Sequence, residues 1–307
     1  LLACWADFGQ EDSESWARYD DVSAERLFKE YGGVTDTLYD ELVSPLLHVL
    51  PMAPGYDISA AAALSCFHVF ALQSRGAFDV RWCRGGISER IFLPWQRRLQ
   101  ARGNVVLQGS ARVSSVSRVG DDPASRLRVD IDAREEDEAG SLEADAVILA
   151  VGATAAARLT EASPALRPLA ATQKFRDFRG ITCVACRIFL RPPSAVRTCG
   201  LLGGLRDSTL LPGEVARAME ASPVVVVGAG VGNLPELKET GFCIYDLQRM
   251  HDEHADGDLA VLEVDFFRAD ALAAIESDVE LSEFALRAVT AALQLPPSVF
   301  DPQWIED

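Results

Sequence analysis

Hydrophobic and polar residues alternate in three different ways along the chain. Residues 21–75 carry apolar residues at helical spacing, with Ser23 placed to cap the first helix. The run 58–72 is apolar on nearly every side, which is typical of a buried helix. We therefore expect a helical region over residues 1–84, in which the polar and acidic residues 1–20 form a loosely held arm.

The pattern changes to strands within residues 85–160. After a helix over 89–101, residues 104–119 predict two short strands separated by a glycine. The charged segment 134–143 predicts a solvated hairpin tip. Residues 144–153, ADAVILAVGA, form a continuous apolar run, which is typical of a strand buried on both faces.

Strands and helices alternate again in residues 161–307. The last helix is predicted to begin at Ser282, which serves as its cap, and a shorter helix is predicted over 271–278. The fold class that these patterns predict is α/β, with α and β elements mixed. Further strands are predicted over 181–190, 223–230, 241–247 and 259–267.

Composition narrows the classes of function. The chain has 307 residues, 49% of them hydrophobic, which is enough for a large core. A net charge of −17 repels phosphate backbones, so we expect no nucleic-acid partner. The most apolar window, 58–72, is too short to span a membrane, although it could make a peripheral membrane contact. Seven scattered cysteines predict reduced, mostly buried thiols and an intracellular protein.

The segment 224–233, VVVVGAGVGN, is the most conspicuous local motif, because a strand followed by glycines often begins a dinucleotide-binding fold. Asn233 stands where the last glycine of G-x-G-x-x-G belongs, and only the eight residues NLPELKET separate the turn from the next strand. The pattern favours a buried strand and a glycine turn. The alternative is a phosphate-binding loop with Asp246 near the ribose.

Two pairs of side chains could bind a metal or form a redox centre. His251 and His254 lie three apart in the acidic segment 251–258, but no further histidine or cysteine completes a zinc frame. We therefore expect a solvated loop and no metal site. Cys183 and Cys186 lie inside a predicted strand, where residues three apart face opposite sides, so we expect no redox pair.

Two segments resemble one known family. Residues 83–119, CRGGISERIFLPWQRRLQARGNVVLQGSARVSSVSRV, resemble the glycine-rich turn, helix and strand of the FAD-dependent amine oxidases and carotenoid (phytoene) desaturases. Residues 144–159, ADAVILAVGATAAARL, are similar to a strand and loop that pass the cofactor in that superfamily. The resemblance extends over most of residues 19–295.

The resemblance implies an FAD/NAD(P)-binding-type fold with a helical and antiparallel-sheet substrate domain. Residues 85–160 would be the middle of the FAD domain, and residues 1–84 and 161–307 the substrate domain. The chain would be a fragment, because the N-terminal G-x-G-x-x-G and the C-terminal Gly-Asp segment of the family are expected outside it. The implied FAD contacts are Gly85, Gly86, Val113, Ala150, Val151 and Gly152, and the implied substrate contacts are Phe67 and Phe70.

The leading hypothesis is an FAD-dependent oxidoreductase that acts on a fairly apolar small molecule, with the flavin carrying the chemistry. No catalytic side chain is assigned. One alternative is a nicotinamide-dependent α/β enzyme that uses the glycines at 228–232, which a long following helix would favour. The other is a non-catalytic remnant or subunit of the flavoenzyme fold. The resemblance to desaturases further implies a plastid location.

Overall fold

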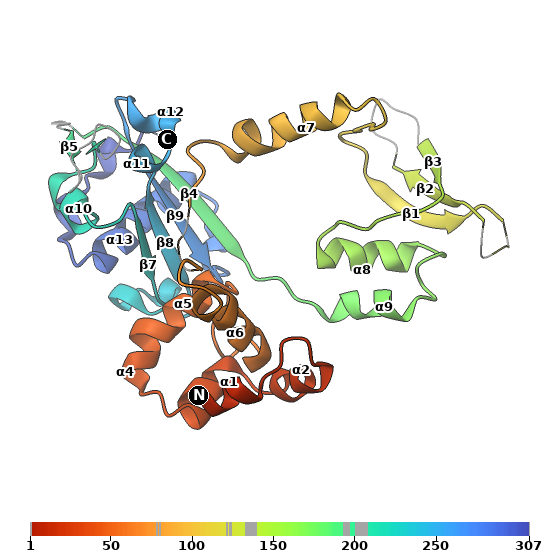
Figure 1. The fold of residues 1–307 in the computed structure, drawn as a ribbon. Helices are drawn as coiled ribbons and strands as arrows, with labels where there is room; N and C mark the ends of the chain where they lie inside the picture. The colour runs from red at the N-terminus through yellow and green to blue at the C-terminus, as the bar shows by residue number, and fades with distance from the viewer. Residues whose placement is uncertain are drawn as a thin grey trace. The chain divides into compact units, whose positions relative to one another are not determined.

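The chain divides into two compact units, which are described separately below. The first combines Leu1–Phe92 with Ile181–Asp307, and the second is Leu93–Gly180. The domain boundaries at 84 and 160 remain predictions. Most of the charged tip expected at 134–143 lies outside the described residues. The computed structural model (Figure 1) describes residues 2–77, 79, 81–120, 122, 125–132, 140–192, 197–199 and 208–306.

The N-terminal part of the first unit is helical, as predicted. Ser23 Oγ accepts a hydrogen bond from the Arg26 backbone N at 3.2 Å, so the cap predicted at Ser23 is confirmed. For the helix within 58–72, where the sequence offered Asp57 or Ser59 as the cap, it is Ser59 whose Oγ accepts a hydrogen bond, from Ala62 N at 3.2 Å. The helices are α1 (Leu2–Asp7), α2 (Ser13–Asp20), α3 (Ala24–Arg26), α4 (Asp36–Leu38), α5 (Ser44–Val49) and α6 (Ala60–Phe67), with π-helical turns η1 (Leu27–Tyr31), η2 (Tyr39–Val43), η3 (His68–Leu72) and η4 (Ser88–Phe92).

The expectation of a loose N-terminal arm is wrong. Phe8 is buried, and the rings of Trp16 and Tyr19 meet it edge-on at centroid distances of 5.5 and 5.7 Å. These aromatics pack against α6, where Leu64 is buried in the same cluster. Each of these aromatic side chains buries a large apolar area, so a few of them are enough to hold the segment against α6.

The C-terminal part of the first unit contains an antiparallel sheet with the strand order β4-β9-β8-β7. It confirms the strands predicted in this region. The backbone of residues 304–306 adds to the outer edge of β4, where Arg191 N donates to Trp304 O at 2.8 Å. The strands are β4 (Cys183–Leu190), β7 (Val224–Val227), β8 (Gly241–Asp246) and β9 (Ala260–Phe267), and a separate pair is formed by β5 (Thr198–Cys199) and β6 (Ser208–Thr209).

One face of this sheet packs against the long helix α13 (Asp278–Ala292), and together they form the main core. Phe266 on β9 lies between Phe242 and Phe284, with ring centroids at 5.2 and 6.1 Å. The cap of α13 is Ser277, whose Oγ accepts from Glu280 N at 3.3 Å. The predicted cap at Ser282 is therefore wrong by one and a half turns.

Short helices fill the connections. The helix expected over 271–278 forms only as the 3₁₀ turn η9, and residues 275–277 after it are irregular. Between β8 and β9, the solvated loop expected over 251–258 contains one helical turn, and another helical turn precedes it. The remaining elements are α10 (Gly213–Ala218), η7 (Val231–Asn233), η8 (Pro235–Leu237), α11 (Leu247–Met250), α12 (Asp252–Ala255), η9 (Leu272–Ala274), η10 (Pro297–Val299) and η11 (Pro302–Trp304).

Each cysteine whose side chain the structure describes is free, and fewer of these side chains are buried than expected. Cys186 and Cys243 are buried, whereas Cys183 is exposed and Cys4, Cys66 and Cys83 are half-buried. Cys183 and Cys186 face opposite sides of β4, as the strand pattern predicted. Burial raises the pKa of both thiols, which disfavours the reactive thiolate.

The glycine segment after β7 is a turn and not a phosphate loop. β7 is an edge strand and pairs antiparallel with β8, so there is no parallel crossover at this point. Gly230 and Gly232 adopt φ values of +82° and +69°, and 3₁₀ turns of three residues follow. Asp246, the proposed ribose ligand of the alternative, is fully buried. The predicted strand and glycine turn are confirmed, but the strand is not buried as expected, because it lies at the edge of the sheet and Val226 is 41% exposed.

Gly232 is required by packing as well as by its backbone angle. A Cβ at this position would lie 2.6 Å from Ala291 Cβ of α13, whereas a Cβ at Gly230 would meet nothing within 4 Å. We expect Gly232→Ala to destabilise the fold by about 2 kcal/mol more than Gly230→Ala, since both variants share the left-handed backbone cost. Urea unfolding of the two variants measures this difference. Equal midpoints would show that α13 does not constrain the turn.

The second unit contains a three-stranded antiparallel sheet with the order β1-β2-β3. Its helix α8 is fastened to β1, because Val116 N donates to Ser163 Oγ at 2.8 Å just beyond the helix end. Its elements are α7 (Leu93–Gln100), β1 (Val113–Arg118), β2 (Leu127–Ile131), β3 (Gly140–Ala144), α8 (Ala153–Ala162), α9 (Ala170–Gln173) and the 3₁₀ turn η5 (Lys174–Asp177).

Two predicted strands of this unit are not formed. Residues 105–108 and 145–150 are irregular, and Val106 and Ile148 are 91% and 90% exposed. The expectation of a strand over 144–153 buried on both faces is therefore wrong. A strand of that kind needs neighbours on both edges and cover on both faces, and the described residues of the unit supply neither.

Candidate functional site

A cavity of about 420 Å³ opens on the face of the β4-β9-β8-β7 sheet opposite α13. We call it the polar cavity. Three segments of the first unit bound it: the sheet itself, residues 81–89, and the α11–α12 turn. Its lining contains Arg81, Trp82, Cys83, Gly85, Gly86, Ile87, Ser88, Glu89, Arg187, Tyr245, Leu247, Met250, His251, Glu253, Glu263 and Asp265.

Strand alternation places charged groups on the cavity side of the sheet. In β9, Glu263 and Asp265 are two residues apart and share one face, while Val264 and Phe266 between and beyond them enter the main core. Register brings Tyr245 of β8 beside Glu263, because the two residues are direct cross-strand partners. The sheet therefore separates an apolar, supporting face from a face that carries titratable groups.

Asp265 is the most perturbed carboxyl of the cavity. Burial and, to a smaller extent, the neighbouring Glu263 raise its pKa to about 6, against the lowering effects of Arg187 and of a hydrogen bond from Tyr245. Its Oδ1 is buried and has no hydrogen-bond partner among the described residues. Glu263 is instead paired with Arg187 at 2.5 Å. Of the two acidic residues that β9 contributes to the cavity, Glu263 is therefore paired with a cation, whereas Asp265 keeps one oxygen without a partner.

The segment 81–89 forms the opposite wall and is tied to α12. Arg84 Nε lies 3.1 Å from Asp252 Oδ1, and Asp252 N donates to the Arg84 carbonyl at 3.0 Å. The Trp82 ring meets Tyr245 edge-on, with centroids 5.4 Å apart. Gly85 and Gly86, which the family resemblance assigned to the cofactor, lie in this wall.

A second cavity, of about 370 Å³, is almost entirely apolar and lies among the N-terminal helices. Phe67 lines it and packs edge-on against Phe28, at a centroid distance of 5.4 Å. Phe70, the other expected substrate contact, is 39% exposed and does not line this cavity. The apolar cavity could accept a hydrocarbon group but offers it no polar orientation.

The remaining expected cofactor residues lie in the second unit. Val113 begins β1 and is 38% exposed, and Val151 is 48% exposed just before α8. Ala150 is exposed beside it. Gly152 is the N-cap of α8, where a Cβ would meet nothing within 4 Å and no side chain caps the helix.

These residues fit part of an FAD site. The first turn of α8 contains no acidic residue, so its free backbone N–H groups could receive an anionic group. The exposed backbone before Gly152 could be approached closely by a flat ring. The fit rests on accessible backbone and not on a side chain specific for flavin.

Comparison with known proteins identifies the class of the chain. No curated protein sequence matches it. Among solved structures, a triple mutant of putrescine oxidase with redesigned cofactor binding matches with a TM-score of 0.57 and 16% identity. The match covers 97% of this chain and 56% of that one, so the chain spans about half the length of that structure. The fold is thus of the FAD-binding α/β type, as predicted.

The sequence profile of the flavin containing amine oxidoreductases matches residues 6–304. The chain belongs to that family. The predicted relation to amine oxidases is confirmed, while the relation to desaturases and the fragment hypothesis stay predictions. No helix of the described residues is both long and apolar enough to cross a membrane.

The titratable groups that the sheet contributes to the polar cavity were not predicted from the sequence. Glu263 and Asp265 interrupt the otherwise apolar strand LAVLEVDFF at positions that share one face. That spacing was a usable signal, because a solvated strand face would carry polar residues along its whole length. Arg187 lies on the same face through the register of β4 with β9.

Proposed function

We propose that the chain forms the substrate-binding part of an FAD-dependent oxidoreductase that oxidises amines. The observation that carries the proposal is the buried Oδ1 of Asp265, which lacks a partner at the edge of a cavity large enough for a small molecule. A substrate ammonium group is the natural partner for such an oxygen, because it is cationic and donates hydrogen bonds.

Each cavity residue has a part in this proposal. Asp265 Oδ1 accepts a hydrogen bond from the substrate nitrogen and, with a pKa of about 6, can take up and release a proton near neutrality. Trp82 and Tyr245 offer aromatic surface to the same cation. Arg187 keeps Glu263 paired, so of the two acidic residues of β9 only Asp265 offers the substrate an oxygen without a partner.

FAD would be held by the exposed backbone of the second unit. Val113, Ala150, Val151 and Gly152 would contact it through their backbone. Cofactor contact by Gly85 and Gly86 of the first unit stays a prediction. When bound, FAD supplies the two-electron acceptor that no side chain can provide.

The apolar cavity supports a second candidate, oxidation of a fairly apolar substrate such as a desaturase would take. Its lining, which includes Phe28 and Phe67, is almost free of polar atoms. Peripheral membrane contact and a plastid location belong to this candidate and stay predictions. The nicotinamide-dependent alternative would be favoured by a long helix after Gly232, but only 3₁₀ turns follow this residue.

If the chain is instead a non-catalytic remnant, no substrate will reduce the flavin.

Anaerobic reduction of the flavin tests these candidates. The FAD-loaded protein is mixed with primary amines of increasing chain length and with uncharged alcohols of the same length, and the loss of flavin absorbance is followed. We expect reduction by amines only. Asp265→Asn should raise the half-saturating amine concentration roughly 10-fold or more, because a charge-assisted hydrogen bond is lost.

The matched control is Asp258→Asn, since Asp258 is an exposed carboxyl that does not line the cavity. It should leave the half-saturating concentration unchanged. Equal reduction by alcohols, or an equal effect of the two substitutions, would contradict the amine assignment.

A further inference from the structure

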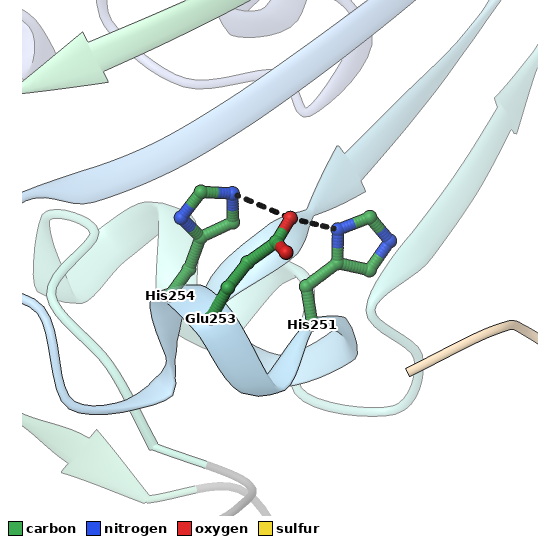
Figure 2. A group of neighbouring side chains, drawn as sticks. All are labelled: His251, Glu253 and His254. Carbon is green, nitrogen blue, oxygen red and sulfur yellow. Dashed lines mark ion pairs between the residues drawn. The ribbon is translucent and has the colours of Figure 1, made fainter. Parts of the chain in front are cut away.

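The turn around α12 brings together three side chains that the proposed function does not use (Figure 2). His251, Glu253 and His254 each offer one ligand atom, and these atoms all lie within 4.8 Å of one another. Figure 2 shows the Glu253 carboxylate between the two imidazole rings, with one nitrogen of each ring directed toward it. Two nitrogens and one oxygen thus converge on a small volume.

The distances suit a metal ion better than a hydrogen-bonded cluster. His251 Nδ1 lies 3.5 Å from Glu253 Oε1, and His254 Nε2 lies 3.7 Å from the same oxygen. Neither contact has hydrogen-bond geometry. Ligands around a tetrahedral zinc ion, with bonds of about 2.0–2.1 Å, stand about 3.4 Å apart. Two of the three ligand pairs are therefore near coordination distance.

Both histidine nitrogens lack a partner. His251 Nδ1 and His254 Nε2 are buried and have no hydrogen-bond partner within the part of the chain that the structure describes. A buried polar atom without a partner is costly, and these two nitrogens point at one carboxylate. A bound cation would satisfy all three groups at once.

The surroundings hold the histidines in place while leaving a path to them. The His254 ring packs edge-on against Phe189 at a centroid distance of 6.0 Å, and each histidine side chain is 16% exposed. Glu253 is 45% exposed, and both it and His251 line the polar cavity. An ion can therefore enter from the cavity without opening the core.

We propose that His251, Glu253 and His254 bind a divalent ion of the Zn²⁺ class on the wall of the polar cavity. Two imidazoles and one carboxylate are ligands that zinc accepts, and three protein ligands leave a fourth position for water. The sequence analysis expected no metal because it sought the further ligand among histidines and cysteines. The structure supplies it as Glu253, between the two histidines. The proposal is independent of the flavin chemistry.

Titration of the protein with Zn²⁺ in competition with a chromophoric chelator tests the proposal. We expect one tight site per chain in the unchanged protein. His251→Gln, Glu253→Gln and His254→Gln should each weaken binding by at least about 10-fold. Zn²⁺ should also raise the thermal midpoint of the unchanged protein and not that of the variants, which follows from binding to the folded state.

Two controls separate this site from other sources of binding. Asp256→Asn and Asp258→Asn remove exposed acids of the same segment and should leave the affinity unchanged. Replacement of Zn²⁺ by Co²⁺ should give bands of four-coordination without thiolate charge transfer, which excludes the free cysteines as ligands. Glu253→Gln is the variant least able to disturb folding, because its side chain is partly exposed. Unchanged affinity in that variant, a thiolate spectrum, or no binding would each overturn the proposal.

Discussion

Phe266→Ala is expected to lower the free energy of unfolding by about 3–5 kcal/mol, the largest effect of any substitution considered for this protein. Phe266 is fully buried in β9, which pairs with a strand on each side. Its ring packs against Phe242 and Phe284, so truncation leaves a cavity between the sheet and α13. Equilibrium unfolding in guanidinium chloride measures the loss.

Val226→Ala is the matched control, because it shortens an apolar side chain in the same sheet. Val226 lies on the edge strand β7 and is 41% exposed. We expect a loss of less than about 1 kcal/mol there. A Phe266 variant that is no less stable than the Val226 variant would show that the core does not lie between the sheet and α13.

Asp246→Asn is expected to change the pH dependence of stability by about 3 kcal/mol. Asp246 is fully buried at the end of β8, and its carboxylate oxygens have no hydrogen-bond partner among the described residues. Burial raises its pKa from 3.8 to about 6. The charged form is therefore disfavoured in the folded protein.

The sign follows from proton binding. Between pH 3.8 and about 6 the folded protein holds a proton on Asp246 that the unfolded chain has released, so stability falls as the pH rises through this window. An asparagine side chain does not titrate, so the variant does not lose stability in this way. The free energy of unfolding of Asp246→Asn, relative to the unchanged protein, should increase across the window and then stay constant.

Denaturant unfolding of both proteins at a series of pH values checks this expectation. Asp265, whose pKa is also raised to about 6, is present in both proteins and cancels in the comparison. Asp258→Asn is the control, since an exposed carboxyl pays no burial cost. A stability difference for Asp246→Asn that is independent of pH would contradict the assignment.

Local signals in the sequence predicted the sheet and the helix cap at Ser23 well, and they narrowed a second cap to Asp57 or Ser59. The strands β4, β7, β8 and β9 are rich in β-branched and aromatic residues and are bounded by turn residues, so each is specified by its own composition. Ser23 and Ser59 act within a few residues of themselves. These features need no information from distant parts of the chain.

Features that depend on distant partners were predicted poorly. The N-terminal arm is ordered by contacts with α6, which no local pattern reveals. The run over 144–153 was expected to be a buried strand, yet Ile148 is 90% exposed, because an apolar composition cannot form a strand without neighbours. The polar cavity was missed because register, and not sequence proximity, brings Arg187, Tyr245 and Asp265 to one face.

Because alternate residues of β9 face opposite sides of the sheet, mutations that change the cavity and mutations that change the core fall on different residues of this strand. Val264 and Phe266 hold the core, whereas Glu263 and Asp265 face the cavity. A mutation at either acidic position can alter what the cavity accepts while the packing beneath it stays intact. Selection could therefore exchange one substrate for another by changing cavity-facing residues of a single strand, with little loss of stability to limit the path.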